Sequence, residues 1–283
     1  MDAKVLDVSR IPSKIENQIF MKWTVDRIRK LKGKGKIVSL TAYDYSTAQL
    51  VDEAGINLII VGDSLGMTVL GYDSTIPVTM DDMVHHTRAV MRGVTSALVV
   101  ADMPFLSYQV TPDQAVDNAG RLIKEAGADA VKIEGGAFRA DTVRHLIANG
   151  IPVMGHIGLT PQSVRAFGGY KVQGRTGAGA DQLKADAIAL AEAGVFALVL
   201  EGIPADLAVD ITASVPVPTV GIGAGPGCDG QVLVVHDMLG MYAKFTPKFV
   251  KRYAELGGTM RHAFTSYKQE VEDGTFPADE HCY

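Results

Sequence analysis

The stretch that decides the fold is EAGADAVKIE, residues 125–134, in which a helix-ending tripeptide is followed directly by an apolar run. Two other segments have the same layout, EAGINLIIVGD at 53–63 and EAGVFALVLE at 192–201. Glycine readily adopts the left-handed conformation with which many helices end, and each apolar run begins about two residues later. Each segment therefore predicts the end of a helix followed by a buried strand, and Asn149-Gly150 predicts a fourth helix end.

Apolar runs of this kind recur along the whole chain. They cover residues 36–41, 57–62, 97–101, 130–133, 152–155, 197–200, 219–222 and 232–235. They are nearly continuous in Val, Ile, Leu and Ala, which is typical of strands buried on both faces of a parallel sheet. Amphipathic stretches lie between them, and three of these begin after a candidate N-cap residue, Thr79, Thr111 or Thr160.

Eight strands that alternate with helices over about 250 residues predict an α/β fold, namely a parallel eight-stranded (β/α)8 TIM barrel. We expect residues 1–283 to form a single domain, with an N-terminal helical extension over about 1–35 and a C-terminal helical tail over about 247–283. The alternative is an open doubly wound sheet. However, its glycine fingerprint is missing after the first strand, which runs into Ala42-Tyr43-Asp44.

The composition excludes several classes of protein. Hydrophobic residues make up 47% of the 283 and charged residues 21%, which excludes a disordered chain. A formal net charge of −5 argues against nucleic acid as a partner. The longest apolar run, 195–200, is far shorter than the roughly 20 residues that span a bilayer, and residues 1–20 lack the apolar core of a signal peptide. With only Cys228 and Cys282, we expect a soluble, cytoplasmic protein without a disulfide framework.

Charged and polar residues follow the apolar runs at the points where the strands end. In chain order they are Asp63-Ser64, Asp102, Lys132 with Glu134, His156 and Glu201. The carboxyl ends of all barrel strands meet at one mouth, where catalytic residues are found. An acid after a strand is often only a helix N-cap. Because four separate strands each present an acid there, we expect one shared site.

Lys132 is the least expected residue for a strand that should be buried on both faces. Lys132 and Glu134 are two positions apart, so both point to the same face of the strand. Charged groups at such a position are costly unless they are paired, solvated or bound to an ion. Two interpretations are open: the residues belong to a polar site, or they form an ion pair that fills the barrel.

Clustered carboxylates repel one another unless a cation compensates them, and oxygen ligands alone favour Mg²⁺ or Mn²⁺. We expect Asp63 and Asp102 to hold such an ion, with Glu134 binding it directly or through water. The ion would stabilise an enolate, and Glu201 would then act as the general base. His85 and His86 are adjacent on a predicted helix and cannot both face one zinc site.

Two glycine-rich segments have open roles. GIGAGPGCDG, residues 221–230, follows the seventh strand, where many barrels bind phosphate, although glycine loops also serve tight packing. GGYKVQGRTGAG, residues 168–179, lies on a long loop after the fifth strand and is either a lid or an oligomer contact.

Several longer motifs, taken together, resemble the ketopantoate hydroxymethyltransferase family. They run in order along nearly the whole chain: LTAYDY at 40–45, VGDSLGM at 61–67, ADMPF at 101–105, VKIEGG at 131–136, GHIGLTPQS at 155–163, GGYKVQGR at 168–175, LEGIP at 200–204 and GIGAGPGCDG at 221–230. The resemblance implies a (β/α)8 barrel that binds one Mg²⁺ per subunit. It also implies transfer of a hydroxymethyl group from 5,10-methylenetetrahydrofolate to 3-methyl-2-oxobutanoate, which gives ketopantoate in pantothenate biosynthesis.

The resemblance further implies roles for individual residues and an assembly. Glu201 is expected to be the proton acceptor, and the family's bacterial members commonly form homodecamers. The expected contacts fall into two groups, with Asp63, Ser64, Asp102 and Lys132 on the keto acid and Asp63, Asp102 and Glu134 on the metal. Two alternatives remain open: a Mg²⁺-dependent 2-oxo acid lyase or mutase of the phosphoenolpyruvate mutase/isocitrate lyase type, and a non-catalytic barrel.

Overall fold

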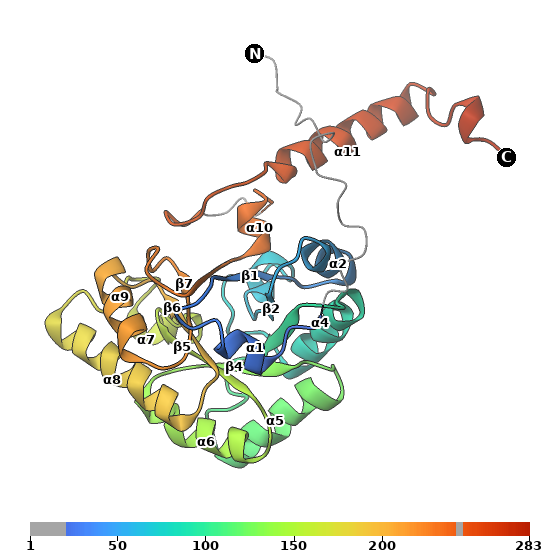
Figure 1. Ribbon diagram of the computed structural model, residues 1–283. Coiled ribbons are helices and arrows are strands. Elements are labelled where there is room, and N and C mark those ends of the chain that lie inside the picture. Colours follow the sequence, from blue (N-terminus) through green and yellow to red (C-terminus); the bar gives the residue numbers. More distant parts are fainter. Residues whose placement is uncertain (1–20, 242–245) are drawn as a thin grey trace.

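The strands of the computed structural model, which describes residues 21–241 and 246–283, form a closed parallel barrel in the order β1 to β8 (Figure 1). The expected (β/α)8 barrel is therefore confirmed. The barrel closes between its first and last strands, where Ile37 pairs with Gly230. The strands are β1 (Ile37–Thr41), β2 (Leu58–Val61), β3 (Leu98–Asp102), β4 (Ala130–Glu134), β5 (Val153–Gly158), β6 (Ala197–Glu201), β7 (Thr219–Ile222) and β8 (Gly230–Leu233).

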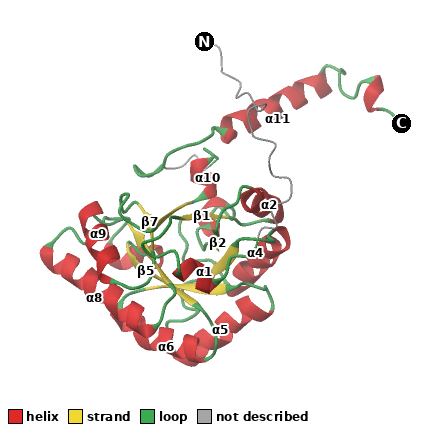
Figure 2. Ribbon diagram, in the orientation of Figure 1, coloured by secondary structure: helices red, strands yellow, loops and turns green. Residues whose placement is uncertain are grey.

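Helices surround the strands, as the red ribbons around the yellow arrows in Figure 2 show. The α-helices are α1 (Val25–Arg29), α2 (Tyr45–Glu53), α3 (Leu65–Thr68), α4 (Met80–Gly93), α5 (Pro112–Lys124), α6 (Ala140–Ala148), α7 (Val164–Phe167), α8 (Gly177–Ala193), α9 (Ala205–Ser214), α10 (Val235–Met238) and α11 (Leu256–Glu272). Short 3-10 helices lie at η2 (Ala137–Arg139), η3 (Pro161–Ser163) and η4 (Asp279–His281).

Local sequence signals explain where the helices begin and end. Thr79 and Asp82 form the expected capping box of α4, and the Thr111 side chain caps α5 ahead of Pro112. Gly194 ends α8 in the left-handed conformation, with φ at 102°. Thr160 differs from the expectation, because its side chain makes no capping hydrogen bond and the turn after it is the 3-10 helix η3.

The strand–helix alternation breaks once, between β7 and β8. Residues 223–229 connect these strands without a helix, and β8 begins at Gly230, two residues before the expected start of that strand. A side chain at Gly230 would lie 2.4 Å from the main-chain oxygen of Ile37, so the close approach of β1 and β8 requires glycine there.

Two apolar layers stabilise the barrel: side chains inside it, and side chains between the strands and the outer helices. Helix α1 covers the amino-terminal end of the barrel. Its Ile28 is fully buried, and Lys32 forms an ion pair of 2.9 Å with Asp229 just before β8. The open mouth of the barrel therefore lies at the carboxyl ends of the strands. Of the extension expected over about 1–35, residues 1–20 lie outside the described residues.

Helix α11, in the expected C-terminal tail, stands away from the barrel (Figure 1). None of its residues is buried, and its large apolar side chains Met260, Phe264, Tyr267 and Val271 are 40–63% exposed. No helix in the described part of the chain is long and apolar enough to cross a bilayer.

Candidate active site

The barrel mouth brings together every site residue expected from the sequence. Asp63 follows β2, Asp102 ends β3, and Glu201 ends β6. Lys132 and Glu134 lie on β4, and His156 lies on β5. These six side chains and Ser64 line one cavity of about 110 Å³. All are buried except those of Ser64 and Glu201, which are partly exposed, so the charged groups have little access to bulk water.

The Lys132 ammonium lies at the centre of this cluster. Its Nζ is 3.2 Å from Asp102 Oδ1 and 3.2 Å from His156 Nδ1. Among the described residues no ion pair joins Lys132 to Glu134, so the second interpretation of β4, a Lys–Glu pair filling the barrel, is wrong. Burial alone would lower the pKa of Lys132, but the charges of Asp102 and Glu134 outweigh it and raise that pKa above its usual value. Lys132 is therefore a fixed positive charge in the mouth.

Asp63 and Asp102 place two carboxylates side by side in a buried site. The Asp63 main-chain N–H donates to Asp102 Oδ2 at 3.1 Å, whereas Asp102 Oδ1 is buried without a hydrogen bond. Burial, followed by the charge of Asp102, raises the pKa of Asp63 to about 7. Burial likewise raises the pKa of Glu134 well above its usual value. When its acids are all ionised, the cluster carries more negative charge than Lys132 alone can compensate, and the raised pKa values reflect this.

The donor set at the mouth fits a hard cation. The described residues contain no group of three His, Cys, Asp or Glu side chains arranged to hold a metal ion. A pair of carboxylates, with an Asp102 oxygen that accepts no hydrogen bond and contacts only the Lys132 ammonium among the ion pairs of the described residues, nevertheless suits Mg²⁺, because this ion keeps several water ligands and takes few from the protein. Asp63 and Asp102 therefore stay the predicted ligands of such an ion.

Gln162, which the sequence interpretation did not single out, connects the acids. Its Nε2 donates to Asp63 Oδ2 at 2.8 Å, and its main-chain N–H donates to Glu134 Oε2 at 3.0 Å. The Tyr108 hydroxyl donates to Gln162 Oε1 at 2.7 Å and thereby fixes which end of the amide faces Asp63. Gln162 follows β5, just as the acids follow or end their own strands. This position in the sequence could have identified it as a site residue.

Ser64 stands at the rim of the cavity beside Tyr43. The two hydroxyl oxygens are 2.8 Å apart, and burial raises the pKa of Tyr43 to about 12, so the phenol stays protonated. Ser64 begins helix α3 without a side-chain capping bond. Its hydroxyl is thus positioned by Tyr43 and faces the cavity that contains Asp63.

Glu201 is the most accessible acid of the cluster, with a side chain 17% exposed. Burial raises its pKa to about 7, although the charge of Lys132 opposes the shift. Its Oε2 is 3.2 Å from His156 Nε2. Burial, followed by the charge of Lys132, lowers the pKa of His156 well below its usual value, so the imidazole is neutral at pH 7.

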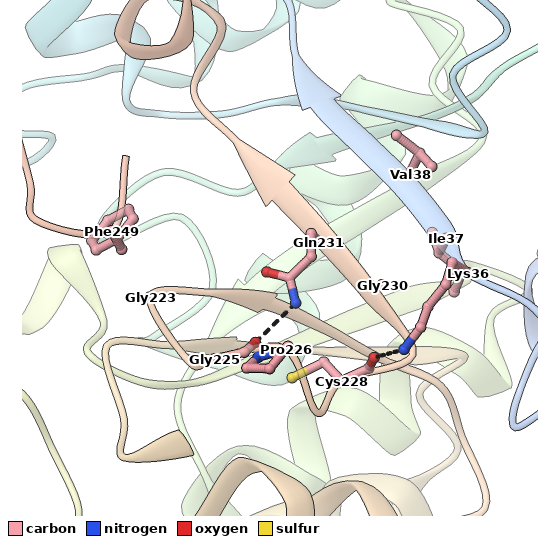
Figure 3. A pocket seen from close by; sticks show the side chains of 10 residues that line it. All are labelled: Lys36, Ile37, Val38, Gly223, Gly225, Pro226, Cys228, Gly230, Gln231 and Phe249. Carbon is pink, nitrogen blue, oxygen red and sulfur yellow. Dashed lines mark hydrogen bonds between the residues drawn. The ribbon is translucent and has the colours of Figure 1, made fainter. Parts of the chain in front are cut away.

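The two glycine-rich segments lie in different places. In the loop after α7, the Tyr170 hydroxyl is 3.5 Å from Met67 Sδ in α3, so this loop reaches a helix that follows β2. The residues after β7 instead line a groove of about 530 Å³ along β1 and β8 (Figure 3). The exposed Val38 and Gln231 show that this groove is on the outer face of the barrel. Gly223 and Gly225 therefore do not line the acidic cavity.

Comparison with known proteins shows which family the chain belongs to. A family model for ketopantoate hydroxymethyltransferase matches residues 22–279. The chain is 58% identical over 263 residues to a 3-methyl-2-oxobutanoate hydroxymethyltransferase of Syntrophus aciditrophicus, covering 93% of this chain and 97% of that protein. It is 59% identical over 261 residues to the enzyme of the same name from Moorella thermoacetica, covering 92% and 97%.

Solved structures share the fold at low sequence identity. A phosphonopyruvate hydrolase in complex with oxalate and Mg²⁺ superposes with a TM-score of 0.60 at 15% identity, over 91% of this chain and 93% of that one. A 2,3-dimethylmalate lyase of the phosphoenolpyruvate mutase/isocitrate lyase superfamily gives 0.59 at 16% identity, over 93% and 92%. These structures show a common barrel and nothing finer. From the family match and the close relatives, the chain belongs to the ketopantoate hydroxymethyltransferase family.

Proposed function

We propose that this protein transfers a hydroxymethyl group from 5,10-methylenetetrahydrofolate to 3-methyl-2-oxobutanoate and so forms ketopantoate for pantothenate and coenzyme A biosynthesis. Two observations support the proposal: the family membership, and the single buried mouth in which Asp63, Asp102, Glu134 and Glu201 surround Lys132. The second observation carries the mechanism, because an enolate reaction needs a positive site for the oxygen and a base for the carbon.

The keto acid would occupy the cavity lined by Ser64, Asp102 and Lys132. The negative charge of the keto acid would be attracted to the ammonium group of Lys132, which is buried and remains protonated across the neutral pH range. Ser64 would donate a hydrogen bond to a substrate oxygen, because its partner Tyr43 stays protonated and is able to donate in turn. These contacts would orient the substrate so that its third carbon faces Glu201.

Asp63 and Asp102 would hold one Mg²⁺, with Glu134 nearby to accept a hydrogen bond from a water ligand or to bind directly. When bound, the ion supplies positive charge that stabilises the oxygen of the developing enolate. Gln162 would hold Asp63 Oδ2 and Glu134 Oε2 in place, which leaves the second oxygen of each acid for the ion or its water.

Glu201 would accept the proton from the third carbon of the substrate. A pKa raised to about 7 by burial suits this step, because the carboxylate is then present at neutral pH and remains a useful base. The resulting carbon nucleophile would attack the methylene carbon of the folate, and the bond from this carbon to N10 would break as N10 takes a proton. Water would then displace N5 from the same carbon, which supplies the hydroxyl group and releases tetrahydrofolate with a proton on N5.

The cavity of about 110 Å³ suits the small keto acid, so the folate would approach from the open side of the mouth. The loop between α7 and α8 reaches towards α3 through Tyr170 and Met67, which favours a lid over this side.

We also propose that the chain works as a cytoplasmic homodecamer. Two exposed surfaces support contacts between copies of the chain. One is the apolar face of α11, and the other is the outer groove at β1 and β8, which no helix covers because none connects β7 to β8. Light scattering on the full chain tests the assembly, and a monomer at working concentration would contradict it.

The activity itself is tested by incubating the purified full chain with 3-methyl-2-oxobutanoate, methylenetetrahydrofolate and Mg²⁺ while ketopantoate is measured. We expect product formation that requires the folate and stops when EDTA removes the metal. Folate-independent cleavage of a substituted malate would instead favour the lyase or mutase alternative, and no metal-dependent turnover of any 2-oxo acid would favour a non-catalytic barrel.

A further inference from the structure

His156 occupies the position between the fixed cation of the mouth and the candidate base. It lies on β5, where its main chain pairs with Glu134 on β4 and with Val199 on β6. Its Nδ1 is 3.2 Å from Lys132 Nζ, and its Nε2 is 3.2 Å from Glu201 Oε2. The ring is therefore in contact on one side with an ammonium and on the other with a carboxylate, and the sheet fixes its place.

The contact with Lys132 determines which ring nitrogen carries the proton. A protonated lysine has only donors, so it donates to Nδ1, and Nδ1 must be the acceptor. Glu134 Oε1 is 3.6 Å from the same nitrogen, which is too far for a competing hydrogen bond. A ring whose Nδ1 accepts from Lys132 has no proton on that nitrogen, so its single proton is on Nε2.

The Nε2–H group has no well-aligned hydrogen-bond partner among the described residues, yet it is buried beside Glu201 Oε2. A buried donor without an acceptor is costly, and the last torsion of a glutamate side chain rotates easily. A small turn of the Glu201 carboxylate would align its oxygen with Nε2–H. Lys132 and Glu134 from β4 and Asp102 from β3 lie on the Nδ1 side of the ring, and Glu201 from β6 faces Nε2. The main chain of Leu159, just after β5, also lies close enough to the ring to affect its pKa.

We infer that His156 is a positioning residue for Glu201: the Lys132 ammonium fixes the imidazole with its proton on Nε2, and Nε2–H holds Glu201 Oε2. The other carboxylate oxygen, Oε1, is then left to take the substrate proton. This inference rests on the proposed role of Glu201 as the base. It adds that the base is oriented by a chain of two hydrogen bonds that begins at Lys132 (a chain that crosses from β4 through β5 to β6).

A matched pair of substitutions tests the inference, because amide side chains mimic one ring nitrogen each. His156→Gln places an amide donor where Nε2 stands, whereas His156→Asn reaches only as far as Nδ1 and leaves Glu201 without a donor. The readout is exchange of the C3 proton of 3-methyl-2-oxobutanoate with deuterated solvent, measured with Mg²⁺ on the full chain. This exchange reports on the base without the folate step.

We expect His156→Asn to slow exchange by about 10- to 100-fold, the usual cost of losing an orienting partner, while His156→Gln stays within about fivefold of the original protein. The pH at which exchange is half-maximal should move upward in His156→Asn, because the carboxylate has lost a donor. The KM for the keto acid should stay within about twofold in both variants, as expected when ground-state binding is unchanged.

Two results would overturn the inference. One is an exchange rate and pH profile of His156→Asn equal to those of the original protein. The other is an equal loss in both variants accompanied by a raised KM, which indicates a structural role. Glu201→Gln serves as the reference. If this variant exchanges the C3 proton at the original rate, the proposed base is wrong. If it does not exchange the proton while His156→Asn does so normally, only the proposed role of His156 is wrong.

Discussion

Buried carboxylates at the two ends of the barrel behave in opposite ways. At the amino-terminal end, Asp52 and Asp229 are buried acids whose pKa values are lowered. At the mouth, Asp63, Glu134 and Glu201 are acids whose pKa values are raised. All of these side chains expose little surface, but the mouth acids are enclosed more deeply by protein, so burial and the partners of each carboxylate both contribute to the difference.

Asp52 shows what a fully satisfied acid looks like. It accepts hydrogen bonds from the main-chain N–H groups of Thr95, Ser96 and Ala97, and from two hydroxyl groups. Burial by itself would raise the pKa of Asp52, but these donors outweigh burial and lower it. Asp229 has a comparable set that includes Lys32 and the N–H of Thr219. These acids join the loops before the strands and stabilise the closed end of the barrel.

The acids of the mouth lack such a set of donors, and they crowd one another. Asp63 faces Asp102, and Lys132 is shared among several carboxylates. The closed end of the barrel thus uses its charges to stabilise the fold, whereas the mouth keeps under-compensated charges available for a cation and a substrate. Substitutions of the same kind at the two ends should therefore have opposite consequences.

The largest effect is expected from Asp63→Asn. Loss of a metal ligand removes several kcal/mol of transition-state stabilisation, so turnover should fall by about 1,000-fold or more. The stability of Asp63→Asn should, in contrast, be higher than that of the original protein at alkaline pH. The pKa of Asp63 is higher in the folded protein than in the unfolded chain. Its contribution to the free energy of unfolding is therefore fully present below pH 4 and is lost as the pH rises through about 7. Without metal, thermal unfolding at pH 8 should therefore occur at a higher temperature in Asp63→Asn.

The control for this prediction is thermal unfolding at pH 4, where Asp63 is protonated in the folded protein. At this pH the unfolding temperature of the variant should differ little from that of the original protein. A lower unfolding temperature of Asp63→Asn at pH 8 in EDTA would show that the carboxylate of Asp63 stabilises the fold, as Asp52 does, and would remove the contrast between the two ends.

A smaller effect of the opposite kind is expected from Asp52→Asn. The amide places an NH₂ group against main-chain donors, so the loss should be about 3 kcal/mol in the free energy of unfolding. For a chain of this size that lowers the unfolding temperature by roughly 6–12 °C. Turnover per folded molecule at 25 °C should be unchanged, measured at equal protein concentration. A drop in turnover without a change in unfolding temperature would contradict the structural role of Asp52.

A still smaller effect is expected from Gln162→Leu, which removes the Nε2 donor to Asp63 and keeps the main-chain donor to Glu134. Affinity for Mg²⁺, measured by calorimetry, should fall by about 10-fold, at the low end for an orienting partner of a ligand. Gln109→Leu is the matched control, because Gln109 contacts Gln162 Oε1 but no acid of the mouth. Equal losses in both variants would mean that general packing, rather than the hold on Asp63, sets the affinity.

The sequence predicted the barrel because each Glu-Ala-Gly helix end is followed by a run buried on both faces, and seven of the eight strands begin within a residue of the expected place. The eighth was displaced by two residues, since close packing of Gly230 against Ile37, rather than hydrophobic periodicity, sets where β8 begins. Thr160 was expected to cap a helix, but the chain there forms a 3-10 turn that brings Gln162 back to the acids.

The gathering of the acids could be predicted because strand ends converge in any barrel. The partners of those acids could not be predicted, because they depend on side-chain directions between strands. Lys132 therefore pairs with Asp102 instead of Glu134, and the contacts of Gln162 and His156 were missed. The glycine-rich segment after β7 has the composition of a phosphate loop, and only its path shows that it lines an outer groove.

The central claim is that the mouth acids are under-compensated until a cation binds, and the pH dependence of Mg²⁺ binding tests it most directly. With the pKa of Asp63 at about 7, the ion must displace a proton at pH 6 but not at pH 8. Calorimetry in two buffers of different ionisation enthalpy should show proton release of up to one per site at pH 6, and affinity rising about tenfold per pH unit until about pH 7. An affinity independent of pH between 5.5 and 8, with no proton released, would contradict the account.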